Sequence, residues 1–194
     1  MTTTEPLRAT FTAMTEGTAE DWQRIAASQL AFYPGLPDRV MAHLRLLDDD
    51  FGGFKVDRLT HSLQTATRAY RADRPDDYIA CALIHDIGDT LCTFSHPDIG
   101  AAIVKPFVDD DLHWMVEKHG IFQGYYFFHH LGLDRNMRDQ FEGHPYYDLT
   151  AEFCADFDQP SFDPDYPTMA LEEFEPLLRD FFRSPKRSTY KRED

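Results

Sequence analysis

Residues 82–89, ALIHDIGD, place an imidazole and two carboxylates directly behind an apolar run. Adjacent residues on a helix point about 100° apart, so His85 and Asp86 cannot pair with each other across one helix face. Two explanations stay open at this point. Either a helix ends here and meets solvent, with Gly88 as its terminator, or both side chains reach a common ligand.

Apolar residues recur three and four positions apart along most of the chain, and the alternation typical of strands is scarce. One all-α domain is therefore expected over residues 1–194, with a Gly-containing loop over 48–54, a Pro- and Asp-rich loop over 159–167 and a polar tail over 184–194. In the first helix, Trp22, Ile25, Ala26 and Leu30 form one stripe. The predicted helices span 18–32, 36–47, 57–70, 76–87, 99–107, 112–119, 122–128, 146–157 and 171–182.

The chain carries 19 Lys and Arg against 34 Asp and Glu, a formal net charge of −15. A field of that sign repels nucleic acid and anionic membranes and favours cations, so we expect a small-molecule substrate and neither of those partners. Three cysteines without a CxxC pattern indicate free thiols. No signal-like N-terminus and no long apolar run are present, and a cytoplasmic location is expected.

Four histidines and two aspartates fall near predicted helix ends or on inward stripes. A single buried His in a helical protein is most often a hydrogen-bonded core residue, but this combination favours a metal centre. Imidazole and carboxylate ligands suit iron or manganese, and the lack of paired cysteines argues against structural zinc. The two oxygens of Asp86 could bridge two metals. The candidate ligands are His61, His85, Asp86, His96, His119 and Asp156.

The pattern H…HD…D, with HSLQ at residues 61–64 and ALIHDIGD at 82–89, resembles the HD-domain superfamily of metal-dependent helical proteins. The additional pair His96 and His119 is similar to the mixed-valent di-iron oxygenases of that superfamily, which include myo-inositol oxygenase and the hydroxyphosphonate-cleaving oxygenases. The similarity covers roughly residues 57–156, so the predicted metal-binding core is 57–158 in a single HD-type domain.

This resemblance implies an Fe(II)/Fe(III) pair that uses O₂ as co-substrate, with Asp86 as the bridging and catalytic residue. Oxidation at the carbon that bears the substrate hydroxyl would then lead to C–C or C–P cleavage. One iron would be bound by His61, His85, Asp86 and Asp156, and the other by Asp86, His96 and His119.

The chain departs from the phosphonate-cleaving relatives around the substrate. Phe51 and Phe54 stand where some of them have a Tyr and a Glu that gate one iron, so the gate is absent or is supplied by a residue such as Tyr33. Asp89 replaces a basic residue after the HD pair, and Gln123 replaces a Lys four residues after the last His. The pocket has thus lost basic groups.

This change suggests that some of the aromatic residues in 122–128, with Asp89 and Phe51 or Phe54, form a cage for a quaternary ammonium group. Arg135, Arg138 and Lys105 are candidates to bind a phosphonate. The pattern is most similar to oxygenases that cleave (R)-1-hydroxy-2-(trimethylammonio)ethylphosphonate to glycine betaine and phosphate, which implies metabolic coupling to a 2-oxoglutarate-dependent hydroxylase. The predicted substrate contacts are Asp89, Gln64, Gln123, Phe51, Phe54, Tyr126 and Arg135.

Three alternatives stay open. An HD phosphohydrolase would use its metal to activate water against a phosphate ester, and would work without O₂. An oxygenase acting on the primary-amine 2-amino-1-hydroxyethylphosphonate would differ in substrate alone. A non-catalytic HD module would tolerate loss of His61 or His119 without loss of function.

Overall fold

The computed structural model describes residues 8–188, and every regular element in that range is helical, so the all-α prediction is confirmed. The α-helices are α1 (Ala19–Phe32), α2 (Leu36–Leu44), α3 (Arg58–Arg71), α4 (Asp76–Ile84), α5 (Asp89–Cys92), α6 (His96–Val104), α7 (Asp110–Phe127), α8 (Tyr147–Glu152) and α9 (Glu175–Phe181). The short helices are η1 (Met14–Glu16), η2 (Tyr33–Gly35), η3 (Arg45–Leu47), η4 (Thr93–Ser95), η5 (Phe128–Leu131), η6 (Met137–Phe141), the π-helix η7 (Phe153–Asp158) and η8 (Leu171–Phe174).

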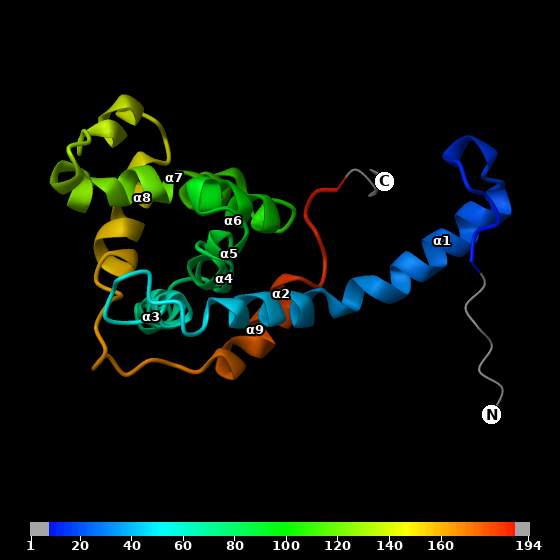
Figure 1. Cartoon of the computed structure of the whole chain (residues 1–194), viewed down its shortest axis with the longest axis horizontal. Helices are drawn as coiled ribbons and strands as arrows, with labels where there is room; N and C mark the ends of the chain where they lie inside the picture. The colour runs from blue at the N-terminus through cyan, green and yellow to red at the C-terminus, as the bar shows by residue number, and fades with distance from the viewer. Residues whose placement is uncertain (1–7, 189–194) are drawn as a thin grey trace.

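Helix α4 is the centre of the body, because residues 78–84 are all buried. It packs against α3 along one side and is also contacted by α6, α7 and α9 (Figure 1). The apolar run before His85 is therefore a helix surrounded by protein on every face, which is why it lacks an amphipathic pattern. This burial fixes the position of the residues that follow it.

The segment after α4 differs from the prediction. The helix ends at Ile84 rather than at residue 87, and Gly88 has a φ of −73°, so it is not the left-handed cap expected of a terminating glycine. A Cβ at Gly88 would lie 2.5 Å from the backbone oxygen of His96. Glycine is needed here because α6 passes so close, and the chain continues directly into α5.

Two further helices differ in extent. The segments predicted over 112–119 and 122–128 form the single helix α7, which runs through Gly120 and Gly124. The helix predicted over 146–157 is α8 followed by the π-helix η7. The second difference changes which aspartate reaches the centre of the molecule.

Helix α1 forms as predicted, but its apolar stripe packs on no part of the body. Figure 1 shows α1 leaving the body at the end of α2 and projecting from it. Trp22 is 39% exposed and Leu30 68% exposed. Beyond the η2 turn that continues it, α1 packs substantially on no other helix within residues 8–188.

The start of the predicted polar tail is bound to the body. The backbone N–H of Lys186 donates to the carbonyl of Pro106, and the side chains of Lys186 and Arg187 pair with Asp109 and Asp110. Residues 189–194 of that tail lie outside the described residues. No helix in the described range is both long and apolar enough to cross a membrane.

Candidate metal centre

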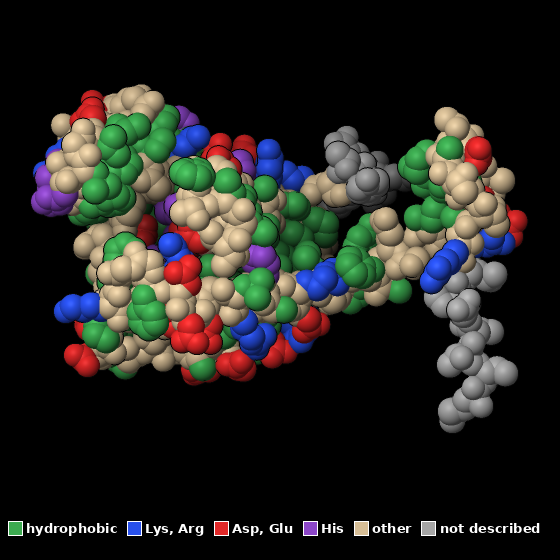
Figure 2. Space-filling model, in the orientation of Figure 1, with side chains coloured by type: hydrophobic (Ala, Val, Ile, Leu, Met, Phe, Trp, Pro, Cys, Tyr) green, Lys and Arg blue, Asp and Glu red, His purple; other side chains and the backbone are tan. Residues whose placement is uncertain are grey.

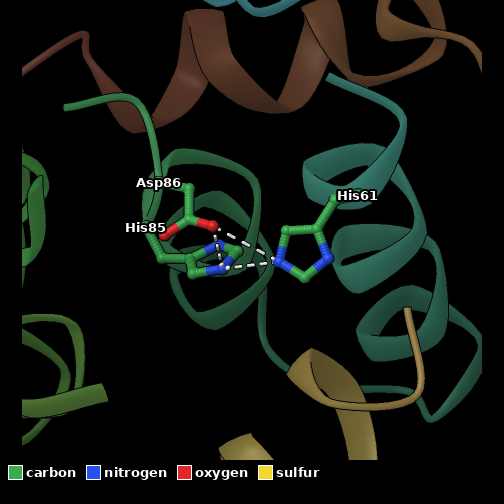
Figure 3. Close-up of side chains that lie close together, drawn as sticks. All are labelled: His61, His85 and Asp86. Atoms are coloured by element: carbon green, nitrogen blue, oxygen red, sulfur yellow. Dashed lines mark hydrogen bonds and ion pairs between the residues drawn. The ribbon is translucent and has the colours of Figure 1, made fainter. Parts of the chain in front are cut away.

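The predicted histidines converge at one place in the body. His61 lies in the first turns of α3, His85 and Asp86 directly follow α4, His96 begins α6 and His119 lies in α7. Figure 3 shows His61 directed from α3 towards His85 and Asp86. The imidazoles of His61, His85 and His119 are almost completely buried. Residues that are far apart in sequence are thus brought together by the packing of four helices.

Asp86 divides the cluster into two halves. Its Oδ2 lies 3.4 Å from the Nε2 atoms of both His61 and His85. Its Oδ1 lies 3.3 Å from Nε2 of His96 and 3.1 Å from Nε2 of His119. Each carboxylate oxygen therefore faces its own pair of imidazoles, which is the arrangement expected of a carboxylate that bridges two metal ions.

Asp158, rather than the predicted Asp156, completes the first half. Its Oδ1 lies 3.2 Å from Nε2 of His61 and 3.8 Å from Nε2 of His85. Asp158 is 2% exposed, whereas Asp156 is exposed at the surface and joins no potential metal-binding group in the described residues. The structure thus places Asp158, two residues after the predicted Asp156, beside the histidines.

The reason is the π-helix η7. Its i→i+5 hydrogen bonding, seen in the donation from Gln159 N–H to the carbonyl of Cys154, widens the turn relative to an α-helix. Counting residues at 3.6 per turn therefore places the wrong side chain on the inner face. Insertions of this kind are frequent at functional sites and leave little signal in a single sequence.

Each of the four imidazoles is oriented by its other ring nitrogen. The Nδ1 atoms of His61, His85, His119 and His96 lie 3.0, 2.8, 2.7 and 3.2 Å from the backbone carbonyls of Ser161, Ala82, Val116 and Thr93, respectively. A carbonyl only accepts hydrogen bonds, so each Nδ1 carries a proton and, in the neutral imidazole, Nε2 presents a lone pair towards the cluster. Metal-bound histidines are held in this way.

The centre of the cluster therefore contains acceptors that face one another. Nε2 of His61 lies 3.3 Å from Nε2 of His85, and the buried Oδ2 of Asp158 has no hydrogen-bond partner. Two facing lone pairs and an orphaned carboxylate oxygen are unfavourable unless a cation lies among them. The donor set thus fits the metal ions that the sequence predicted.

The shifts in pKa show the same demand for positive charge, which a proton on Nε2 of His61 meets when no metal ion is bound. Burial by itself lowers the pKa of His61, but hydrogen bonds to Asp158 and Asp86 outweigh it and raise that pKa to about 10. Burial opposes ionisation of Asp86 and Asp158, yet their histidine neighbours hold both carboxyl pKa values below the usual range. Both carboxylates are consequently ionised at neutral pH and available to a cation.

Asp89 contacts protein rather than standing free at the pocket. Its Oδ1 lies 3.2 Å from Nδ1 of His96, and its Oδ2 pairs with the guanidinium of Arg58. Arg58 also pairs with Asp50 at 3.1 Å. Arg58 lies one helical turn before His61, and that spacing could have identified it from the sequence. Asp89 thus lies beside a predicted metal ligand and is already matched by the Arg58 cation.

A pocket of about 450 Å³ opens onto the cluster. Of the predicted substrate contacts, it is lined by Asp89, Gln123, Phe54 and Tyr126. Gln123 also donates to Oδ1 of Asp158 at 3.0 Å. Among the described residues, Arg58 is the one arginine or lysine in the lining.

Three predicted substrate contacts lie elsewhere. The buried amide of Gln64 bonds the backbone of Asp163 through both its nitrogen and its oxygen, because it anchors the loop after η7. Phe51 is 47% exposed and outside the lining. Arg135 stacks on Tyr125 at 4.1 Å and does not line the pocket. Lys105, Arg138 and the suggested gate Tyr33 are also absent from the lining.

The aromatic wall differs from the predicted cage. Of the aromatic residues in 122–128, Tyr126 and Phe127 line the pocket, whereas Phe122 is fully buried in the core. The sequence reasoning missed Phe162, which stacks on the ring of His61 at 4.3 Å and on Phe54 at 4.6 Å. No local pattern marks it, since its loop is placed by contacts with α3.

Comparison with known proteins does not extend this picture, because no protein-family model and no curated protein sequence matches the chain. The candidate site therefore rests on the geometry of its own residues.

Proposed function

We propose that this protein is a metal-dependent enzyme with two metal ions that share Asp86. The observation that supports this most directly is the division of the Asp86 carboxylate, with one oxygen facing His61 and His85 and the other facing His96 and His119. Asp158 would add a ligand to the first ion. The second ion would have fewer protein ligands, which leaves room for substrate or co-substrate.

We further propose that the metals are iron and that the reaction is an O₂-dependent oxidation. Histidine and carboxylate ligands suit iron, and the cluster contains no thiolate. When bound, an Fe(II)/Fe(III) pair supplies the activation of O₂ and the oxidation of a carbon that bears a hydroxyl group. The resemblance of H61…H85-D86 and the His96/His119 pair to mixed-valent di-iron oxygenases supports this assignment.

The proposed substrate is a 1-hydroxyphosphonate, with (R)-1-hydroxy-2-(trimethylammonio)ethylphosphonate as the first candidate and glycine betaine and phosphate as products. Phe54, Tyr126, Phe127 and Phe162 give the pocket an aromatic wall suited to a trimethylammonium group. Arg58 lines the pocket and is the proposed guanidinium for the phosphonate. It pairs with the buried Asp89 and with Asp50, which is 57% exposed, so the phosphonate would replace Asp50. A 2-oxoglutarate-dependent hydroxylase would supply the hydroxyl group.

In this proposal the protein positions groups and excludes water. The carbonyls on the four Nδ1 atoms favour one tautomer of each neutral imidazole. Gln123 donates to Asp158, and the Asp89 carboxylate lies beside His96. The Phe54–Phe162–His61 stack covers the first half of the cluster.

The test combines metal analysis with electron paramagnetic resonance on partly oxidised protein. The proposal expects about two irons per chain and the S = 1/2 signal of a coupled Fe(II)/Fe(III) pair. Turnover of the hydroxyphosphonate should consume O₂ and stop under strict anaerobiosis. Phosphate-ester hydrolysis without O₂ would instead establish the phosphohydrolase, and full function in His119→Ala would establish a non-catalytic module.

The substrate assignment has its own comparison. The trimethylated and the primary-amine hydroxyphosphonates are assayed side by side, with wild-type protein and with Tyr126→Leu. The aromatic wall predicts a preference for the trimethylated compound that Tyr126→Leu reduces by roughly 2- to 30-fold, the range of one cation–π contact. Equal rates for both substrates in the wild type would contradict the ammonium assignment while leaving the di-iron proposal standing.

A further inference from the structure

The projecting arm, residues 8–33, presents apolar side chains that the described residues leave largely exposed, although Arg39 lies over one face of the Phe32 ring. Within it Leu30 is 68% exposed, Phe32 59% and Tyr33 49%. Figure 2 shows hydrophobic side chains at the surface of this arm. An isolated helix of 14 residues is marginal in water, and most helical stability comes from packing of an apolar face. Packing of another protein surface on these side chains would therefore stabilise α1.

The arm points away from its own body. Phe32, Tyr33 and Leu36 all have helical backbone angles, so α1, η2 and α2 follow one another as a nearly continuous rod. The rod begins at the far end of the arm and reaches the body only at α2 (Figure 1). Among residues 8–188, no other helix packs substantially on α1 beyond the η2 turn, so a partner for its apolar side chains is sought on another chain.

The body carries a matching apolar surface beside the other end of α2. Leu46 on η3 is 62% exposed, Leu91 on α5 is 61% exposed, and Phe94 on η4 stands fully in solvent. Helices η3 and α5 are in contact, and Oγ1 of Thr90 lies 3.1 Å from Nε2 of His43 on α2. We call Leu46, Leu91 and Phe94 the receiving surface.

Parts of both surfaces contain no charged residues. The chain has 34 acidic residues, yet residues 25–37 of the rod and residues 90–95 of the receiving surface contain no Asp, Glu, Lys or Arg. Association of two copies with a net charge of −15 is opposed at long range, and uncharged contact segments reduce that opposition where the chains meet. These segments place no like charges opposite each other, so the charge distribution permits a second copy of this chain as the occupant.

We propose that two copies form a two-fold dimer in which α1 of each copy lies along α2 and on the receiving surface of the other. An antiparallel pair of α1–α2 rods brings the arm of one copy beside Leu46, Leu91 and Phe94 of its partner, and the symmetry repeats the contact. The receiving surface adjoins Thr93, which lines the metal-centre pocket. Each arm thus lies next to the mouth of its partner's pocket.

The area is sufficient for a stable dimer. Aromatic side chains bury about 150–250 Å² each, so the exposed parts of Trp22, Leu30, Phe32 and Tyr33 amount to roughly 400 Å² per arm. Two arms and two receiving surfaces together give on the order of 1,600 Å², the size of a standard specific interface.

Sedimentation velocity of the full chain over a range of concentrations tests this proposal. The wild type should be a dimer at micromolar concentration and should associate more strongly as added salt screens the acidic charge. Leu30→Glu/Phe32→Glu on the arm and Phe94→Glu on the receiving surface should each weaken the dimer by at least about 100-fold, as expected for residues at the centre of an interface. Leu133→Glu is the matched control, since Leu133 is 53% exposed on a distant loop.

A cross-link identifies the contact directly. Cys92 is exposed on the receiving surface, whereas Cys81 and Cys154 are buried. A chain carrying Gln29→Cys and Cys92→Ser is mixed with wild-type chain and treated with a short bismaleimide. The proposal expects a product that joins the thiol introduced on the arm of one chain to Cys92 of the other.

Several results would overturn the proposal. They are a wild-type chain that stays monomeric at 100 µM, a dimer that survives both the arm and the receiving-surface substitutions, and a mixture without the cross-link. Phe94 is completely exposed, so Phe94→Glu does not threaten the fold, and circular dichroism verifies that the arm variant keeps its helices. None of these outcomes depends on the identity of the metal.

Discussion

Around Asp86, side chains from α3, the end of α4, α6, α7 and η7 converge within hydrogen-bonding distance. Helix α1 instead leaves the body, and within residues 8–188 it packs mainly on the η2 turn and on the residues just before it. The cluster is held by residues distant in sequence. The arm is held by its own neighbours, through a capping box in which Thr18 and Asp21 bond each other's backbone. One region is fixed by tertiary packing and the other by local sequence.

This difference predicts how far the effect of a substitution extends in each region. In the cluster, each ligand shares Asp86 or Asp158 with another, so a single change alters several contacts at once. In the arm, a change should stay within a few residues and leave the body intact. Substitutions with matched controls can therefore separate the two regions.

The largest effect is expected in the ligand set. Asp158→Asn should reduce metal affinity by more than the 10–100-fold typical of a residue that merely supports a ligand, because a charged ligand is lost. Asp156→Asn is the matched control and should retain full metal content, since Asp156 is exposed. Metal per chain is measured by mass spectrometry after dialysis. If Asp156→Asn loses metal and Asp158→Asn does not, the assignment from the structure is wrong.

Metal removal should weaken the body alone. At a metal concentration of about 100 Kd, binding to the native state contributes about 2.7 kcal/mol per site, which corresponds to roughly 5–11 °C in Tm for a chain of this size. Calorimetry before and after chelation measures the shift, and added Fe(II) should restore it. A Tm unchanged by chelation would contradict a metal centre that is part of the folded structure.

Glycine substitutions contrast the packing of the two regions. A Cβ at Gly100 on α6 would lie 2.5 Å from the backbone oxygen of His85, so Gly100→Ala should lower the free energy of unfolding by about 1–3 kcal/mol. At the root of the arm, a Cβ at Gly35 meets only the movable end of Arg39. Gly35→Ala should be neutral or stabilising by up to about 1 kcal/mol. Urea unfolding of both variants measures the difference, and equal effects would remove the contrast.

The smallest effect is expected at the start of the arm. Hydrogen bonds from the Thr18 side chain and the Thr10 backbone lower the pKa of Asp21 to about 2. Because that pKa is depressed, the contribution of Asp21 is complete above its unfolded value near 3.8 and is lost as pH falls towards 2. Asp21→Asn should abolish this transition without changing the Tm of the body.

The arm transition is observed through Trp22, which packs on Phe11 at 5.4 Å. The difference in fluorescence between wild-type chain and Trp22→Phe isolates its signal from that of Trp114. A transition in Asp21→Asn at the same pH as in the wild type would show that another group controls the arm.

Local rules succeeded where neighbours decide the structure. Helical periodicity predicted most of the helices, and Asp57 caps α3 through a hydrogen bond to the N–H of Thr60, one residue before His61. The same rules indicated His61, His85, Asp86, His96 and His119 as partners, and all five lie in the cluster. Several histidines and aspartates at inward positions of predicted helices can be recognised in the sequence, because few roles other than a shared site place so many of them there.

The sequence by itself therefore determined the helical class, five of the residues in the cluster and the existence of α1. Tertiary structure alone decided that η7 widens into a π-helix and brings in Asp158 instead of Asp156, that Arg58 neutralises Asp89, and that Phe162 covers His61. It also decided that the apolar stripe of α1 faces solvent. The physical reason is the range of the interactions, because periodicity and capping act over a few residues, whereas ligand geometry depends on contacts between segments far apart in the chain, such as that between His61 and Asp158.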